Sequence, residues 1–363
     1  MPHRKKCPIN GTFSHFLRYF RCTGLLSDSE KNITFHVISF IFILATIDSL
    51  VLGLKSLEDA FYLKMTLPYL SCDILSVFIW FSMRRRRCNL KSLLRILSKT
   101  QKMIFTWKEA IFFCVTCCVP FLFSGLKVVQ RVVLHKETPF SIYGFNVTST
   151  SGIIFIFVRS SLWFFIYPTS VNLVVLLYCF LCRNFCRQIN ELAQNILKCS
   201  ARNFTPAKQV NIFVQETRIE DLLQLTQEVF SVPSFLILAA HFCSSIAVLG
   251  DLIYNADFFY TDYFFLSRLL LLFLNSSVGL LACLWTAGGL PLAENQLKDA
   301  FRRKKRERFF LFGKENEEYF QKELMDKPSF MMSGCGIVYL QRSSILTLLG
   351  TVFTFTALLI TDT

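Results

Sequence analysis

The chain has 363 residues, of which 53% are hydrophobic and 18% are charged, and its formal net charge is +14. Soluble domains devote about a quarter of their residues to charged side chains, so this composition excludes an ordinary soluble protein. The apolar residues are gathered in blocks of about 20, the length of helix that crosses the roughly 30 Å hydrocarbon core of a bilayer.

These blocks predict seven membrane-spanning helices. Basic and polar stretches separate them. The fourth block is long and contains Pro168, which predicts a kink in that span. The predicted fold is all-α, an integral membrane bundle of seven helices. In chain order the blocks are residues 35–54, 67–83, 110–134, 152–181, 229–253, 264–290 and 337–361.

The distribution of lysine and arginine predicts the orientation. The N-terminal segment and the loops after the second, fourth and sixth blocks hold 31 of these residues, whereas the other side holds five. Cytoplasmic loops collect lysine and arginine. We therefore expect a multi-pass protein of the plasma membrane with a cytoplasmic N-terminus and an extracellular C-terminus. A rhodopsin-like receptor has the opposite orientation, and none of the 14 cysteines lies in a segment predicted to be outside.

Local motifs indicate little chemistry. Of five N-x-[ST] patterns only the one at Asn146 lies on the predicted outer side, so Asn146 is the candidate glycosylation site. Cys179, Cys182 and Cys186 lack a fourth ligand for a metal, and palmitoylation or ordinary packing remains open for them. No enzyme motif is present, so we expect no catalytic residue, no metal and no cofactor.

Two basic runs lie beside predicted spans, at residues 84–87 and 302–308. Such runs resemble nucleic-acid patches, but next to a membrane they are typical of topology determinants that touch anionic lipid. We therefore expect membrane lipid as a partner and no nucleic acid.

Ionisable residues inside the predicted spans are a stronger signal, because a charge at membrane depth is costly and usually faces a cavity or a partner. They are Asp48, Asp73, Lys127, Arg159, His241 and Arg268. Three of these lie in the outer halves of their spans, and aromatic residues accompany them. This set suits an apolar or amphipathic ligand, although pairing and packing between helices is the alternative. The candidate ligand-binding residues are Tyr69, Asp73, Phe121, Phe123, Phe157, Arg159, Trp163, Phe265 and Arg268.

The end of the chain resembles the insect chemoreceptor family, its gustatory branch in particular. The seventh span of that family carries Thr-Tyr, five hydrophobic residues and Gln-Phe. Here Thr354 and Phe355 stand for the first pair, residues 356–360 fill the spacer, and Thr361 and Asp362 replace the last pair. The chain therefore resembles a divergent member of the family.

Two further segments resemble the same family. Residues 340–343 (LQRS) resemble the turn that precedes its last helix, and the stretch PLAENQLKDAF, with its acid at Glu294, resembles the helix after its sixth span. We accordingly expect a cytoplasmic segment at 1–34, spans one to six with cytoplasmic extensions at 35–290, an anchor-like helix and linker at 291–336, and a pore-lining span at 337–363.

The resemblance implies a ligand-gated, non-selective cation channel, assembled as a homo- or heterotetramer with related subunits. A small-molecule tastant or odorant is then expected among the outer halves of spans two to six, and the seventh spans line one central pore. Asp362 would place an acidic ring, which favours cations, at the pore mouth. A non-conducting structural or regulatory relative is the alternative, because Thr361 and Asp362 depart from the motif; a transporter also stays open. The candidate pore residues are Ile345, Leu348, Leu349, Thr351, Phe353, Thr354, Phe355, Thr361 and Asp362.

Overall fold

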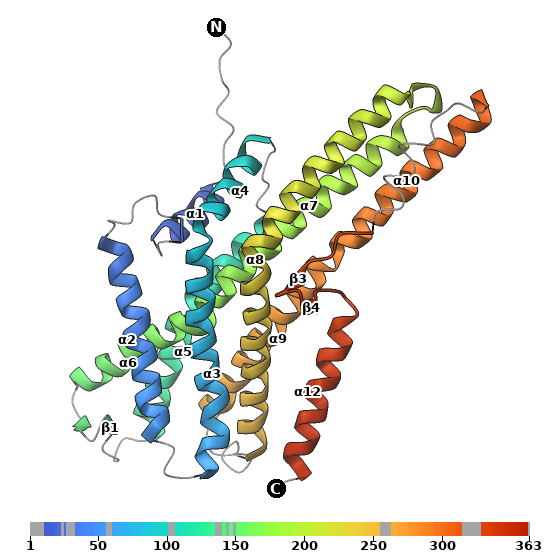
Figure 1. Cartoon of the computed structure of the whole chain (residues 1–363). Coiled ribbons are helices and arrows are strands. Elements are labelled where there is room, and N and C mark those ends of the chain that lie inside the picture. Colours follow the sequence, from blue (N-terminus) through green and yellow to red (C-terminus); the bar gives the residue numbers. More distant parts are fainter. Residues whose placement is uncertain are drawn as a thin grey trace.

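The computed structural model describes residues 11–22, 25–26, 33–55, 60–100, 106–134, 140–142, 145–147, 150–254, 263–313 and 328–361. This part of the chain is helical apart from two short hairpins. Its helices form a bundle from which three long helices project at one end (Figure 1). The predicted all-α fold is confirmed.

The elements follow the expected order. They are α1 (Gly11–Cys22), α2 (Ile33–Lys55), α3 (Ala60–Arg85), α4 (Arg87–Thr100), α5 (Trp107–Leu134), β1 (Phe140–Ile142), β2 (Phe145–Val147), α6 (Thr150–Phe164), η2 (Phe165–Ser170), α7 (Val171–Lys198), η3 (Ala201–Asn203), α8 (Pro206–Tyr254), α9 (Tyr263–Ala287), α10 (Gly289–Phe312), β3 (Ser333–Gly334), β4 (Val338–Tyr339) and α12 (Ser344–Thr361).

Seven helical passes run through the described part of the bundle, formed by α2, α3, α5, the continuous α6–η2–α7, α8, α9 and α12. By length and composition, four described helices can cross a membrane: Trp107–Gln130, Gly152–Lys198, Pro206–Ile253 and Tyr263–Phe312. Shorter apolar helices cover Ser39–Val51 and Ser344–Phe355. Helix α7 is the centre of the bundle, because its first half is buried on every side.

The kink predicted in the fourth span is present. Tyr167 leaves the helical conformation, with φ −131° and ψ 128°, in the π-helical segment η2. Proline lacks an N–H and disfavours the helical conformation in the residue before it, so Pro168 accounts for this break. The break also turns the Tyr167 side chain into the core, where it is buried.

The N-terminal helix α1 lies in the segment predicted only to be cytoplasmic, for which no packing against the bundle was expected. Phe16 and Phe20 lie one turn apart on α1, and both are fully buried in the bundle. Their spacing puts them on one helix face, as in any amphipathic helix. The ring of Phe16 contacts that of Phe113 on α5, with centroids 5.4 Å apart.

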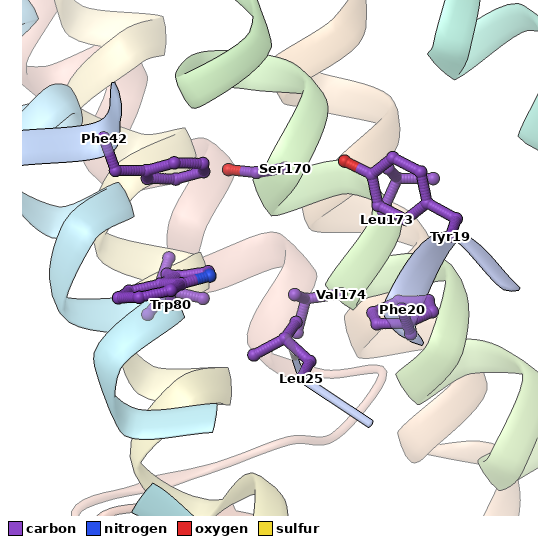
Figure 2. Close-up of a pocket in the computed structure, with 9 residues that line it drawn as sticks. Tyr19, Phe20, Leu25, Phe42, Trp80, Ser170, Leu173 and Val174 are labelled. Atoms are coloured by element: carbon purple, nitrogen blue, oxygen red, sulfur yellow. The ribbon is translucent and has the colours of Figure 1, made fainter. Parts of the chain in front are cut away.

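A small cavity remains between part of α1 and the helices against which it packs. Tyr19, Phe20 and Leu25 form one wall of it, while Phe42 and Trp80 lie opposite (Figure 2). Its volume of about 10 Å³ is the space of one water molecule. The cavity is therefore too small for an odorant-sized ligand.

The projecting end of the bundle consists of α7, α8 and α10 (Figure 1). Near its tip Phe204 packs edge-on against Phe301 of α10, with ring centroids 5.3 Å apart. The Arg308 guanidinium donates to the Phe204 carbonyl at 2.7 Å. Helix α10 ends at Phe312 because Gly313 takes φ +73°, a conformation that favours glycine. Residues 314–327 of the predicted anchor-like helix and linker lie outside the described residues.

Candidate functional site

Six helices place ionisable or phenolic side chains in the half of the bundle opposite the projecting helices. They are Asp48 on α2, Tyr69 on α3, Lys127 on α5, Arg159 on α6, Asp251 on α8 and Arg268 on α9. Each lies within about ten residues of its helix end, which at 1.5 Å per residue is a depth of roughly 15 Å or less. We call these six residues the polar ring.

One side of the polar ring is an ion pair between the first and fourth spans. The Arg159 Nε lies 2.7 Å from the Asp48 Oδ2, and both side chains are partly buried. The Lys127 ammonium interacts electrostatically with Asp48, Arg159 and Arg268. Helices α2, α5, α6 and α9 therefore meet at a group of four charges.

The other side of the polar ring joins α3 to α8. The Tyr69 hydroxyl donates to the Asp251 Oδ2 at 2.6 Å. Arg268 interacts electrostatically with Asp251, and its guanidinium carbon lies 5.3 Å from the centroid of the Phe265 ring. Phe265 thus supplies an apolar surface beside the charges.

Below the ring, about one turn deeper in α3 and α6, Trp163 donates from Nε1 to the Asp73 Oδ2 at 2.8 Å. Asp73 is 2% exposed, and its Oδ1 has no hydrogen-bond partner among the described residues. Buried carboxylate oxygens normally accept a hydrogen bond. The Ser49 hydroxyl of α2 interacts with the same carboxylate, so a protein hydroxyl is at hand for Oδ1, and a water or a bound molecule is the other donor that suits it.

A hydroxyl network closes the site toward the middle of the bundle. The Tyr167 and Ser276 oxygens lie 3.2 Å apart, and the Ser276 hydroxyl lies 2.7 Å from that of Ser244. His241, which the sequence marked as an ionisable residue within a span, is fully buried here, 3.5 Å from the Tyr167 hydroxyl. Gly279 allows this close approach, because a Cβ there would lie 2.5 Å from the His241 Nε2.

The structure brings together most of the candidate ligand-binding residues. Tyr69, Asp73, Arg159, Trp163, Phe265 and Arg268 all take part in the contacts above. Phe123 is buried and lies against Phe164, with ring centroids 4.8 Å apart, and Phe157 is half-buried on α6. Phe121 is 62% exposed on the outside of the bundle, so it stands apart from the group.

Three members of the polar ring were not among those candidates. Asp48 and Lys127 were recognised as charges within spans, but nothing in the sequence showed that they approach Arg159 and Arg268. Asp251 was missed altogether. Its signal was present, because an acid in the run VLGDLIY lies within an apolar block.

Asn146 lies in strand β2, where it faces Ser141 of β1 in an antiparallel hairpin between α5 and α6. This hairpin is at the same end of the bundle as the polar ring (Figure 1). Glycosylation of Asn146 stays a prediction.

The three cysteines at helical spacing on α7 act as packing residues. Cys182 is fully buried, and the Sγ of Cys179 accepts a hydrogen bond from the Thr286 hydroxyl at 3.3 Å. A Cβ on Gly289 would lie 3.3 Å from the Cys186 Sγ, so this sulfur also lies against a neighbouring helix.

Helix α12 lies at the side of the bundle against α8 (Figure 1). It begins at Ser344 and not at Ile337, because Val338–Tyr339 pairs with Ser333–Gly334 in a hairpin before it. Ile345 and Leu348 pack toward the core, and the Phe355 ring meets that of Phe242 with centroids 6.3 Å apart.

The face of α12 directed away from the bundle is apolar. Leu346 and Phe353, two turns apart, are 76% and 72% exposed, and Leu349 is 46% exposed. The hydroxyls of Thr351 and Thr354 bond to carbonyls one turn earlier in the helix, at 2.8 and 2.9 Å. Thr361 ends the helix, and Asp362 lies outside the described residues.

Three contacts fasten the segment before α12 to the other helices. Gln227 of α8 exchanges two hydrogen bonds with the Ser333 backbone, at 2.7 and 3.0 Å. The Glu294 carboxylate accepts from the Phe330 N–H at 2.7 Å. Arg342 lies over the Trp285 ring of α9. The acid and the LQRS turn noted in the sequence therefore both hold this segment in place.

The geometry has close counterparts among solved structures. The insect olfactory receptor OR5 from Machilis hrabei in complex with eugenol superimposes with a TM-score of 0.75 at 11% identity, covering 97% of this chain and 100% of that one. This chain has the fold of an insect olfactory receptor. A second structure of OR5 from Machilis hrabei superimposes with a TM-score of 0.71 at 12% identity, covering 98% of this chain and 100% of that one.

The olfactory-receptor fold confirms the predicted seven-helix membrane bundle. Together with the apolar helices long enough to cross a bilayer, this fold supports a multi-pass membrane protein. The resemblance drawn from the last span is thereby confirmed at the level of the fold. No protein-family profile matches the sequence, and no curated protein matches it either.

Proposed function

We propose that the chain is a subunit of a ligand-gated, non-selective cation channel of the insect chemoreceptor kind, and not an enzyme. The observation that carries this proposal is the division of the fold into two parts. A polar ring lies among α2, α3, α5, α6, α8 and α9, whereas α12 stands at the side with its apolar face uncovered. The polar ring suits a bound ligand, and the uncovered face of α12 suits a pore shared between subunits.

The proposed ligand is a small tastant or odorant held between the polar ring and the Asp73–Trp163 pair. The OR5 structure that superimposes on this chain was solved with eugenol, a small amphipathic molecule. Here the buried Asp73 Oδ1 and the Phe265 ring offer a polar and an apolar contact at neighbouring depths. A ligand bound there touches α3, α6 and α9 together, so it acts on the relative position of these helices.

The proposed pore forms where the seventh helices of four subunits meet. Leu346 and Phe353 are directed away from the subunit's own core, and large exposed apolar residues on one face mark an interface or a pore wall. The hydrogen-bonded segment before α12 links that helix to α8, α9 and α10. Ligand-driven shifts of α9 are then passed to α12 through these contacts.

The same proposal orients the protein in the plasma membrane. The basic residues of α4 and α10 lie at the projecting end of the bundle, which is the cytoplasmic end by the positive-inside rule. The polar ring and Asn146 are then extracellular in orientation. Treatment of expressed protein with a glycosidase, compared with Asn146→Gln, tests this orientation by gel mobility.

Whole-cell current during application of tastants and odorants, beginning with eugenol, tests the channel. We expect a cation current whose selectivity changes in Asp362→Lys and whose amplitude changes in Phe353→Ala. Phe310→Ala is the control, because Phe310 is 84% exposed and belongs to α10, not to α12. Surface-expressed protein that stays monomeric and carries no current would favour the alternative, a non-conducting structural or regulatory relative.

A further inference from the structure

The charges of the polar ring do not balance locally. Asp48 is engaged by Arg159 at 2.7 Å, and Asp251 lies beside Arg268 and Tyr69. Lys127 is left over: within the described part of the chain no carboxylate lies at ion-pair distance from its ammonium. It interacts electrostatically with Arg268 and Arg159, which repel it, and with Asp48, which attracts it but is already paired with Arg159.

An ammonium in this position is unfavourable by itself. Lys127 lies about seven residues, or roughly 10 Å, from the end of α5, and its side chain is only partly exposed. Charged groups taken out of water cost several kcal/mol unless a counter-charge compensates them. Two further cations nearby increase this cost and make the site attractive to an anion.

We propose that Lys127 is the anchor for a ligand with an anionic head group, and that this receptor recognises small amphipathic carboxylic acids. The inference rests on the proposed function and specifies its ligand. A carboxylate at Lys127 would also lie within reach of the field of Arg159 and Arg268. The apolar body of the acid would lie against Phe265 or Trp163, while the Asp73 oxygen accepts any donor that the ligand carries deeper in the site.

A cationic ligand fits the ring less well. The Asp48 carboxylate is already paired with a guanidinium, and the Asp251 carboxylate accepts a phenol hydroxyl and lies in the field of Arg268, so a cation would have to compete with Arg159 and Arg268 for them. Asp73 lies one turn deeper, and a cation would have to pass three positive side chains to reach it. Among the residues that the structure describes, the excess charge of the polar ring is therefore positive, with three cations and two carboxylates.

The test is a binding measurement on purified protein in nanodiscs of phosphatidylcholine, which adds no anionic lipid. Isothermal titration with phenylacetate, methyl phenylacetate and 2-phenylethanol, corrected with empty discs, compares one apolar body with three head groups. We expect phenylacetate to bind at least tenfold more tightly than the other two. Lys127→Met should remove that preference, lowering phenylacetate affinity about tenfold and leaving 2-phenylethanol within twofold.

Two variants keep the result interpretable. Lys127→Arg keeps the charge and should keep the preference for the acid, which a purely structural role of Lys127 would not predict. Lys108→Met removes an exposed lysine at the other end of α5 and should change nothing. Equal affinities for the three probes, no phenylacetate binding, or an acid preference that persists in Lys127→Met would each overturn the inference.

The same proteins separate this inference from the channel proposal. Acid binding without any current would support the anion site and contradict the channel proposal. A current evoked by 2-phenylethanol, without a preference for the acid, would support the channel and contradict the anion site. Repeating the titration in phosphatidylglycerol discs distinguishes a lipid head group. Phosphatidylglycerol could stabilise the wild-type protein but not Lys127→Met, and could prevent phenylacetate from binding. In that case Lys127 binds a lipid head group, and the inference about a carboxylic-acid ligand fails.

Discussion

Arg342, in the turn before α12, lies over the ring of Trp285 near the end of α9, with its guanidinium carbon 4.1 Å from the ring centroid. Gly288 makes this approach possible, because a Cβ there would lie 2.7 Å from the Arg342 backbone nitrogen. The last helix is thus joined to the sixth span by a stacked cation and a glycine. This contact lies on the route by which the ligand half of the bundle would influence α12.

We expect Arg342→Ala to weaken this joint by about 0.5–1 kcal/mol, the range of a cation–π contact whose two partners are exposed. Thermal unfolding of the detergent-purified protein measures the effect, and a double-mutant cycle with Trp285→Leu assigns it to the pair. Arg303→Ala, on an exposed part of α10, is the control. Additive effects of Arg342→Ala and Trp285→Leu would show that the stacking contributes no measurable free energy to stability.

Replacement of Gln227 should loosen the hairpin before α12. Gln227→Leu keeps the size of the side chain but leaves the Ser333 backbone without its two partners. An unsatisfied buried backbone group costs about 1–3 kcal/mol. Hydrogen–deuterium exchange should rise in residues 331–340 and stay unchanged in α7. Gln215→Leu, on the exposed face of the same helix, provides the matched comparison.

Gly279→Ala should destabilise the bundle, because its Cβ would lie 2.5 Å from the His241 Nε2 and the fully buried ring has nowhere to move. Overpacking of this kind costs about 1–3 kcal/mol. Gly125→Ala meets no atom within 4 Å, so it should be neutral or slightly stabilising through helix propensity. Equal melting temperatures for the two alanine variants would contradict the close approach of α8 and α9.

Loss of the Asp48–Arg159 pair should be costly in either single variant. Asp48→Asn or Arg159→Gln leaves a partly buried charge without its counter-ion, at about 1–3 kcal/mol, between the values for surface and fully buried pairs. The exchanged double variant Asp48→Arg with Arg159→Asp should recover much of this loss. Fluorescence-detected melting of the three proteins decides the point, and no recovery in the exchange would argue that geometry outweighs charge here.

Several features were determined by the sequence alone because they depend on neighbouring residues. The apolar blocks specify membrane helices, the excess of lysine and arginine on alternate loops specifies the two ends of the bundle, and Pro168 breaks the fourth span at Tyr167. The polar contents of the spans were visible for the same reason. Charges such as Arg159 and Asp73 stand out in any apolar run.

Only the tertiary structure decided which of these residues meet. Several apolar helices of similar pattern pack in many ways, since hydrophobic burial has no direction. The pairing of Asp48 with Arg159, the hydrogen bond from Tyr69 to Asp251 and the interaction of Lys127 with Arg159 and Arg268 all depend on helix rotation and neighbour choice. Packing also placed Phe121 on the outside and inserted α1 into the bundle. The chain sequence supplies the charged groups, and the packing of its helices decides which of them pair.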